Sequence, residues 1–232
     1  SYYHLGEFAL RSGNLTVFEE NTREAFSFLK NEPSKEFSIA SRILNYMGAV
    51  MYLTGKPDSA LIYYQKALGK VGSMDKTTEN QLYFPAAIKA NMVLLLQSQN
   101  KYEEALQLAQ ECIVLNNKFL QNEKHPLRFR ALRNLSLAYR NLASLYEQIG
   151  DYQNTHTIAN LAYHHAKKYF EPHLLEYFSA VTLLAEAKIA VKDYSNAILV
   201  LQEAENSLKT MQGENPLLWA NYHTIAARAY FE

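Results

Sequence analysis

The sequence predicts an all-α protein built as a solenoid of antiparallel helix hairpins. Three observations lead to this fold class. The 232 residues include only 8 glycines and 6 prolines, so few positions interrupt a helix. Apolar residues recur at spacings of three and four, as on one face of a helix. The punctuating residues recur at intervals of 40 to 50, which indicates a helical repeat.

The prolines mark the repeat most clearly. Pro85, Pro126, Pro172 and Pro216 follow one another at intervals of 41, 46 and 44 residues. Each precedes or opens a helical pattern, where its missing N–H costs nothing. Residues 54–58 form a short turn between two amphipathic stretches, which predicts an antiparallel hairpin.

The same reasoning divides the whole chain into helices. The predicted helices span residues 1–12, 16–30, 36–54, 58–71, 79–98, 101–117, 126–149, 152–169, 173–191, 194–210 and 216–231. They form units of about 1–30, 36–71, 79–117, 126–169 and 173–210, and a partial unit at 216–232. We expect a single array over residues 1–232, cut from a longer protein.

Residues 44–67 resemble a tetratricopeptide repeat (TPR), and residues 60–68 come close to that family's consensus second helix. Aligned on this segment, four repeats place mostly small residues at the family's three close-packing positions. These are Gly48, Ala60, Ala67, Val93, Ala105, Cys112, Ala143, Thr155, Ala162, Ala185, Ala197 and Ala204. Equivalent residues are 45, 50 and 42 apart, not the family's 34, so the chain is similar to the long-helix arrays of kinesin light chains and bacterial regulators. The resemblance implies a right-handed superhelix.

Composition and motifs exclude several kinds of function. The 23 basic and 23 acidic residues balance, which argues against direct nucleic-acid binding. Apolar runs are too short for membrane insertion. The single cysteine, Cys112, excludes an internal disulfide and is expected to be a small buried residue. We expect the cytoplasm as compartment, but a chain that begins at Ser1 leaves the periplasm and others open.

No pattern typical of catalysis is present. The 7 histidines do not form the His-Glu-x-x-His pattern of a zinc helix, and Gly55-Lys56 lacks the remainder of a phosphate-binding loop. We therefore expect no catalytic residues, no metal ligands and no cofactor.

The resemblance implies a groove lined by the first helix of each repeat. Carried onto this chain, the candidate partner-binding residues are Arg42, Asn45, Tyr52, Asn91, Gln97, Arg130, Arg133, Arg140 and Glu147. The following repeat contributes further lining residues, among them Glu186. Such a mixed, moderately polar groove suits a peptide or a partner helix. The family's carboxylate clamp is absent, because only Asn91 matches its residues.

A basic run between residues 118 and 140 is the sharpest local feature. Arg133 and Arg140 are seven residues apart and share a helix face, which Arg130 extends. Arginines on a groove suit an acidic element of a partner. The alternative is a solvated face on which these arginines pair with Glu79, Glu103 or Glu104 of neighbouring helices.

Taken together, the sequence predicts a non-catalytic, protein- or peptide-binding scaffold. We expect it to be the sensing or regulatory segment of a larger signalling or transcription-regulatory protein. Two alternatives remain open. The array could be a homo-oligomerisation module that associates through its uncapped ends or its convex face. It could also position a substrate for a catalytic domain outside this segment.

Overall fold

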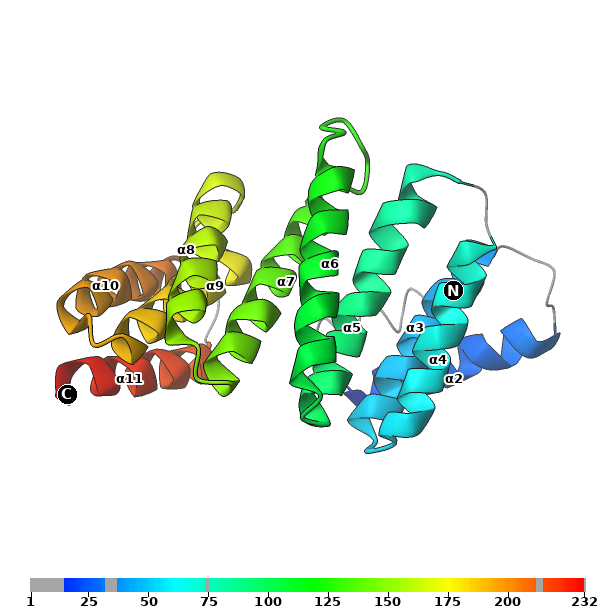
Figure 1. The fold of residues 1–232 in the computed structure, drawn as a ribbon, viewed down its shortest axis with the longest axis horizontal. Helices are drawn as coiled ribbons and strands as arrows, with labels where there is room; N and C mark the ends of the chain where they lie inside the picture. Colours follow the sequence, from blue (N-terminus) through cyan, green and yellow to red (C-terminus); the bar gives the residue numbers. More distant parts are fainter. Residues whose placement is uncertain (1–14, 32–36, 74–75, 212–214, 232) are drawn as a thin grey trace. The chain divides into compact units, whose positions relative to one another are not determined.

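The computed structural model describes residues 15–31, 37–73, 76–211 and 215–231, and the regular elements within them are all helices (Figure 1). They are α2 (Leu15–Asn31), α3 (Phe37–Leu53), α4 (Pro57–Gly72), η1 (Glu79–Tyr83), α5 (Phe84–Ser98), α6 (Tyr102–Leu120), α7 (Arg128–Gln148), α8 (Tyr152–Tyr169), α9 (Leu175–Ala190), α10 (Tyr194–Thr210) and α11 (Pro216–Phe231). The predicted all-α class is confirmed. The predicted helix over 1–12 lies outside the described residues.

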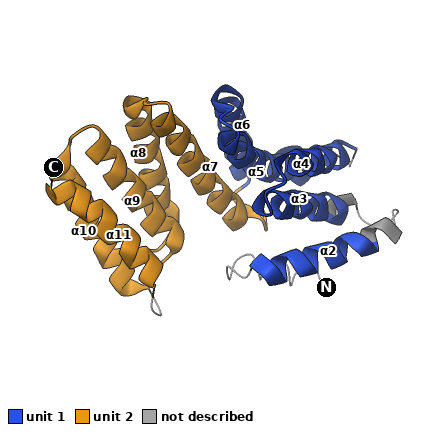
Figure 2. Cartoon of the chain, turned by 90° about the horizontal axis from the view of Figure 1, so that it is seen from below, with its two compact units in different colours: residues 1–122 blue, residues 123–232 orange. Residues whose placement is uncertain are grey.

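The chain divides into two compact units, residues 1–122 and 123–232 (Figure 2). In unit 1, α3 pairs with α4 and α5 with α6, and α2 packs against α3. In unit 2, α7 pairs with α8 and α9 with α10, while α11 packs against both α9 and α10. Each pair is an antiparallel hairpin joined by a short turn (Figure 1).

The close-packing positions predicted from the repeat are all buried. Ala60, Ala67, Ala105 and Ala143 are completely excluded from solvent, and so is Cys112. Gly48 is buried, and the remaining members of the set are at most 3% exposed. Small side chains at these positions let the two helices of a hairpin approach closely. The burial of the complete set supports the predicted repeat register.

The four hairpin turns share one backbone geometry. Each contains a residue with positive φ: Gly55 (73°), Asn100 (58°), Gly150 (79°) and Lys192 (63°). The N–H of the next residue then donates to the carbonyl five residues earlier, at 2.8–2.9 Å. This is the Schellman arrangement, which satisfies carbonyls at the end of a helix. The turn therefore persists where glycine is replaced by asparagine or lysine.

The predicted helix over 79–98 is helical throughout but is not a regular α-helix. It begins with the π-helical turn η1, and α5 starts at Phe84, immediately before Pro85. A proline inside an α-helix has no N–H to donate, and its ring collides with the carbonyl four residues earlier. A wider π turn before Pro85 avoids that collision, which the apolar periodicity did not predict.

The core of unit 2 contains a buried histidine. His165 on α8 is 8% exposed, and its Nε2 lies 3.0 Å from the carbonyl oxygen of Leu132 on α7. Its ring also contacts Tyr139, Tyr169 and Phe170. Burial is the main cause that lowers the pKa of His165 below its ordinary value. The folded state therefore favours the neutral ring.

Acidification should destabilise unit 2 through His165. Because the folded-state pKa of the ring lies below its unfolded value of 6.5, its contribution to stability is complete above that value and is lost as the pH falls below it. Urea unfolding between pH 7.5 and 5 should show a declining free energy of unfolding. The slope should be shallower in His165→Gln. An unchanged slope would mean that His165 titrates as it does in the unfolded chain.

Candidate functional site

In unit 1, two of the predicted groove residues contact each other. The side-chain amide of Asn91 on α5 donates to the Asn45 side-chain oxygen on α3 at 3.0 Å. Asn45 is 9% exposed. Arg42, Tyr52 and Gln97 are all half-buried. Neutral polar side chains therefore join α3 and α5, the first helices of the two hairpins in unit 1. Arg42 is the cation among the predicted groove residues of this unit.

In unit 2, Arg133 is already engaged. Its Nε donates to the Glu176 carboxylate, so an ion pair links α7 to α9. Glu176 is the better buried partner, since its side chain is 14% exposed against 41% for Arg133. The pairing residue is therefore Glu176 rather than Glu79, Glu103 or Glu104. Arg130, one turn earlier on α7, is half-buried.

Arg140 differs from Arg133. Among the described residues it has no hydrogen bond and no ion pair. Its side chain is exposed to solvent, yet surrounding protein atoms lower the pKa of its guanidinium by desolvation. Arg140 is therefore an exposed cation that forms no ion pair with a carboxylate of the described residues.

Glu147 lies seven residues after Arg140 on the same stripe of α7. Its charge raises the pKa of Glu186 on α9, although desolvation is the larger cause, and Arg228 on α11 acts in the opposite direction. We use the name charged face of unit 2 for these four charged residues, Arg140, Glu147, Glu186 and Arg228. It takes residues from all three first helices of that unit.

Sequence reasoning placed Arg140, Glu147 and Glu186 on the groove but missed Glu176 and Arg228. Carrying the repeat register into residues 216–231 could have found Arg228, because Ile225 aligns with Leu184 and Arg228 then falls one residue beyond the equivalent of Glu186. No local signal marks Glu176 as the partner of Arg133, since the two are 43 residues apart.

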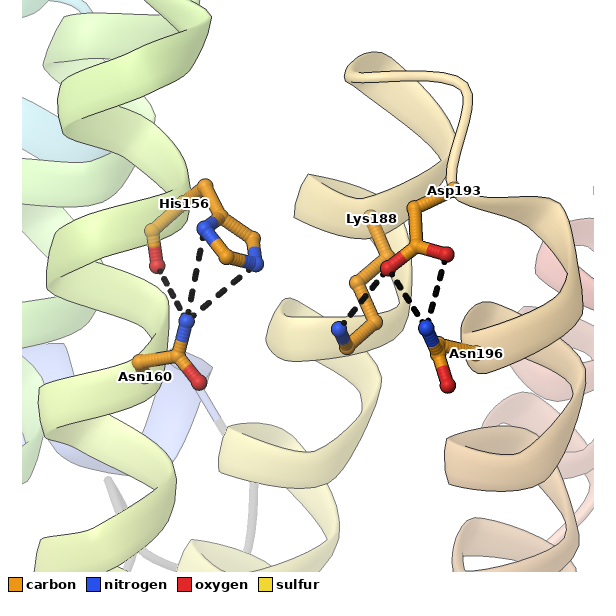
Figure 3. Close-up of polar contacts among 5 residues, drawn as sticks. All are labelled: His156, Asn160, Lys188, Asp193 and Asn196. Atoms are coloured by element: carbon orange, nitrogen blue, oxygen red, sulfur yellow. Dashed lines mark hydrogen bonds and ion pairs between the residues drawn. The ribbon is translucent and has the colours of Figure 1, made fainter.

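A second polar cluster lies where α8 meets the α9–α10 turn (Figure 3). Lys188 pairs with Asp193 at 3.1 Å, and the Asn196 amide donates to both Asp193 carboxylate oxygens at 2.9 and 3.1 Å. Desolvation, followed by repulsion from Lys188, lowers the pKa of His156. The Lys188 and Asn196 contacts satisfy the Asp193 carboxylate at the start of α10, which is a structural role.

The described residues offer little for metal or thiol chemistry. Within the described ranges, no group of three or more His, Cys, Asp or Glu residues could hold a metal ion. Cys112 is fully buried, its Sγ contacts the Ala86 carbonyl at 3.4 Å, and burial raises the pKa of its thiol to about 12. The thiol is thus protonated and inaccessible at neutral pH.

In the same ranges, no helix has the length and hydropathy needed to cross a membrane.

Comparison with known proteins agrees with this architecture. The tetratricopeptide repeat family model matches residues 86–126. No curated protein sequence matches the chain. Several solved structures share its fold at low sequence identity, and three of them illustrate the likeness.

The first is BtubC (BKLC) from P. vanneervenii, with a TM-score of 0.68, 13% identity, and coverage of 99% of this chain and 84% of that one. The apo form of RapI has a TM-score of 0.63 and 15% identity, with coverage of 98% of this chain and 82% of that one. A putative kinesin light chain from Podosopora anserina with TPR-like repeats has a TM-score of 0.60 and 14% identity, with coverage of 91% of this chain and 96% of that one. The chain therefore has the fold of an all-α array of TPR-type helix hairpins, and its residues 86–126 match the tetratricopeptide repeat family model.

Proposed function

We propose that this chain is a non-catalytic scaffold that binds a protein or peptide on the charged face of unit 2. The observation that carries the proposal is Arg140, an exposed cation on a first helix that has no hydrogen bond or ion pair among the described residues. An exposed guanidinium without a partner in the free protein keeps its N–H donors for an incoming group. An acidic group of a partner could accept from two of them at once.

The arrangement of the neighbouring arginines supports the same site. Arg133 is held by Glu176, so it positions α7 against α9 rather than facing a ligand alone. Arg140 lies about 10.5 Å further along α7 and keeps its donors available. A guanidinium presents a fork of donors that matches a carboxylate, which favours an acidic element as the ligand. Helical repeat arrays commonly use such surfaces for binding.

Charge reversal at Arg140 tests the proposal. Binding partners captured by the wild-type chain should bind Arg140→Glu roughly ten- to a hundredfold more weakly, as expected for a lost charge-assisted contact. Lys118→Glu is the matched control, because it makes the same change of net charge on the exposed face of α6 in unit 1. Binding should weaken with rising salt. Equal capture by Arg140→Glu and the wild type would refute this site.

Arg140→Glu should also retain its thermal stability, because Arg140 has no ion pair with the described residues to lose. Arg133→Glu should not, because it would place two carboxylates together at Glu176. The comparison separates a binding arginine from a structural one on the same helix. Circular dichroism melts of the two variants would measure the difference.

A regulatory role in a larger signalling or transcription-regulatory protein is the finer part of the proposal. Homo-oligomerisation is the second candidate, and one observation favours it. The side chains of Leu217, Tyr230 and Phe231 on α11 are 84%, 60% and 91% exposed. If a second copy covers them, light scattering should show a dimer in the wild type and a monomer in Leu217→Glu/Phe231→Glu.

A further inference from the structure

A cavity within unit 1 has no role in the proposed function. Its volume is about 380 Å³, and it lies between the carboxyl end of α4 and the η1–α5 segment that packs against that helix. Its lining residues are Leu68, Val71 and Gly72 of α4, Lys76 before η1, Asn80 and Gln81 of η1, and Pro85 of α5. Pockets that hold small molecules have volumes of roughly 300–1,000 Å³, so this cavity suits a small ligand.

Part of the cavity wall is aliphatic. Val71 is 4% exposed, and Leu68 and Pro85 are half-buried. Gly72 adds no side chain, and a Cβ built there would meet no atom within 4 Å, so the space beside the α4 backbone is open. A short hydrocarbon group placed in the cavity would bury apolar surface against these residues.

The π turn explains why polar side chains reach the same cavity. The chain widens into η1 immediately before the α-helix that contains Pro85, and two consecutive residues of the turn, Asn80 and Gln81, line the cavity together with that proline. Such turns next to α-helices are frequent at functional sites. The irregular backbone therefore has a second consequence besides avoiding the proline ring.

Among the residues that line the cavity, Lys76 alone is charged. Its side chain is exposed, and no hydrogen bond or ion pair joins it to another described residue. The carboxyl end of a helix disfavours anions, but Ser73 weakens that effect at the end of α4. Its N–H and its hydroxyl both donate to the Lys70 carbonyl, at 3.2 and 2.8 Å. The cavity thus combines an aliphatic wall with an available cation.

We propose that this cavity binds a small aliphatic carboxylate. Its hydrocarbon part would contact Leu68, Val71 and Pro85, and its carboxylate would pair with Lys76. The exposed side-chain amide of Gln81 is a further donor for a carboxylate oxygen. A free acid and the carboxyl end of a peptide both present this chemistry. The site is in unit 1 and does not involve Arg140, so it is independent of the proposed function.

Titration of the whole chain with 4-methylpentanoate, followed by NMR, tests the inference. The backbone amide signals of Val71, Gly72, Asn80 and Gln81 should shift until they saturate. The amide 4-methylpentanamide has the same hydrocarbon part without the charge. It should bind about three- to fivefold more weakly, as expected for the loss of an exposed ion pair. In Lys76→Gln the acid and the amide should bind equally.

Filling the cavity gives a second test with a matched control. Gly72→Leu places a side chain in the open space, so the Kd for 4-methylpentanoate should rise at least tenfold. Gly69→Leu makes the same change on the same helix, again with no atom within 4 Å of the Cβ, but residue 69 does not line the cavity. It should bind like the wild type. Thermal melts of both variants check that the fold is kept.

N-acetyl-leucine, which carries the same two groups beside a peptide bond, separates the two sources of the ligand. Tighter binding than that of 4-methylpentanoate would identify the carboxyl end of a peptide, and weaker binding a free acid. Equal binding of the acid and the amide by the wild type would overturn the inference. So would shifts that persist in Gly72→Leu, or no saturable shift at the four residues. Each of these results would leave the proposed site at Arg140 intact.

Discussion

Replacing Gly48 by leucine should lower the free energy of unfolding of unit 1 by about 3 kcal/mol. A Cβ atom at this position would lie 2.4 Å from Cε1 and 2.5 Å from Cδ1 of Tyr64, far inside van der Waals contact. Tyr64 is 1% exposed and belongs to the main core cluster of unit 1, so its ring has no open space to move into. Urea unfolding followed by circular dichroism would measure the loss.

Gly69 provides the control, since it lies in α4 and no atom is within 4 Å of a Cβ built there. Gly69→Ala should stabilise the helix by about 0.5–1 kcal/mol, because alanine loses less backbone entropy than glycine. When Gly48→Ala and Tyr64→Leu are combined, the double variant should lose less than the sum of the single changes. If Gly48→Leu unfolded at the same urea concentration as the wild type, the predicted repeat register would be wrong.

Changes at two equivalent turn residues should have opposite effects. Gly150 has a φ of 79° and Lys192 a φ of 63°, in turns with the same hydrogen bonds. A side chain in this left-handed region costs roughly 1–2 kcal/mol, and a β-branched one costs most. Gly150→Val should therefore destabilise unit 2 by about 2 kcal/mol. Lys192→Gly should stabilise it by about 0.5–1 kcal/mol, after the entropy cost of glycine.

The measurement is chemical unfolding of both variants at one pH. Both residues are exposed, and a Cβ at Gly150 meets no atom within 4 Å, so packing does not compete with the backbone effect. If both substitutions changed the free energy of unfolding in the same direction, the two turns would not be equivalent in solution.

Much of the fold was predictable because its causes are local. The apolar spacing of three and four located the helices within about three residues at either end, apart from the residues the structure does not describe. The repeat register identified the buried small positions, and it located turns even where asparagine or lysine replaces glycine. The π turn before Pro85 was missed because the apolar spacing there favours a regular α-helix, whereas the proline ring collides with the α-helical carbonyl four residues earlier. The periodicity reports only the first of these effects.

The candidate site was predictable only in part. The register places Arg133, Arg140 and Glu147 on one stripe of α7, and nothing in their sequence neighbourhoods distinguishes them. Packing does so, because α9 brings Glu176 to Arg133, while no carboxylate of the described residues pairs with Arg140. In the same way, Arg228 becomes a neighbour of Glu186 only because α11 packs against α9.

The all-α class, the hairpin repeat and the positions where helices approach closely can all be read from the sequence, since each depends on side-chain size and spacing along one helix or turn. The pairing of charges cannot, because it is set by the packing of helices against one another. Ion pairing depends on distances between helices some 40 residues apart in the chain, and these distances decide that Arg133 pairs with Glu176 across two helices while Arg140 pairs with no carboxylate of the described residues.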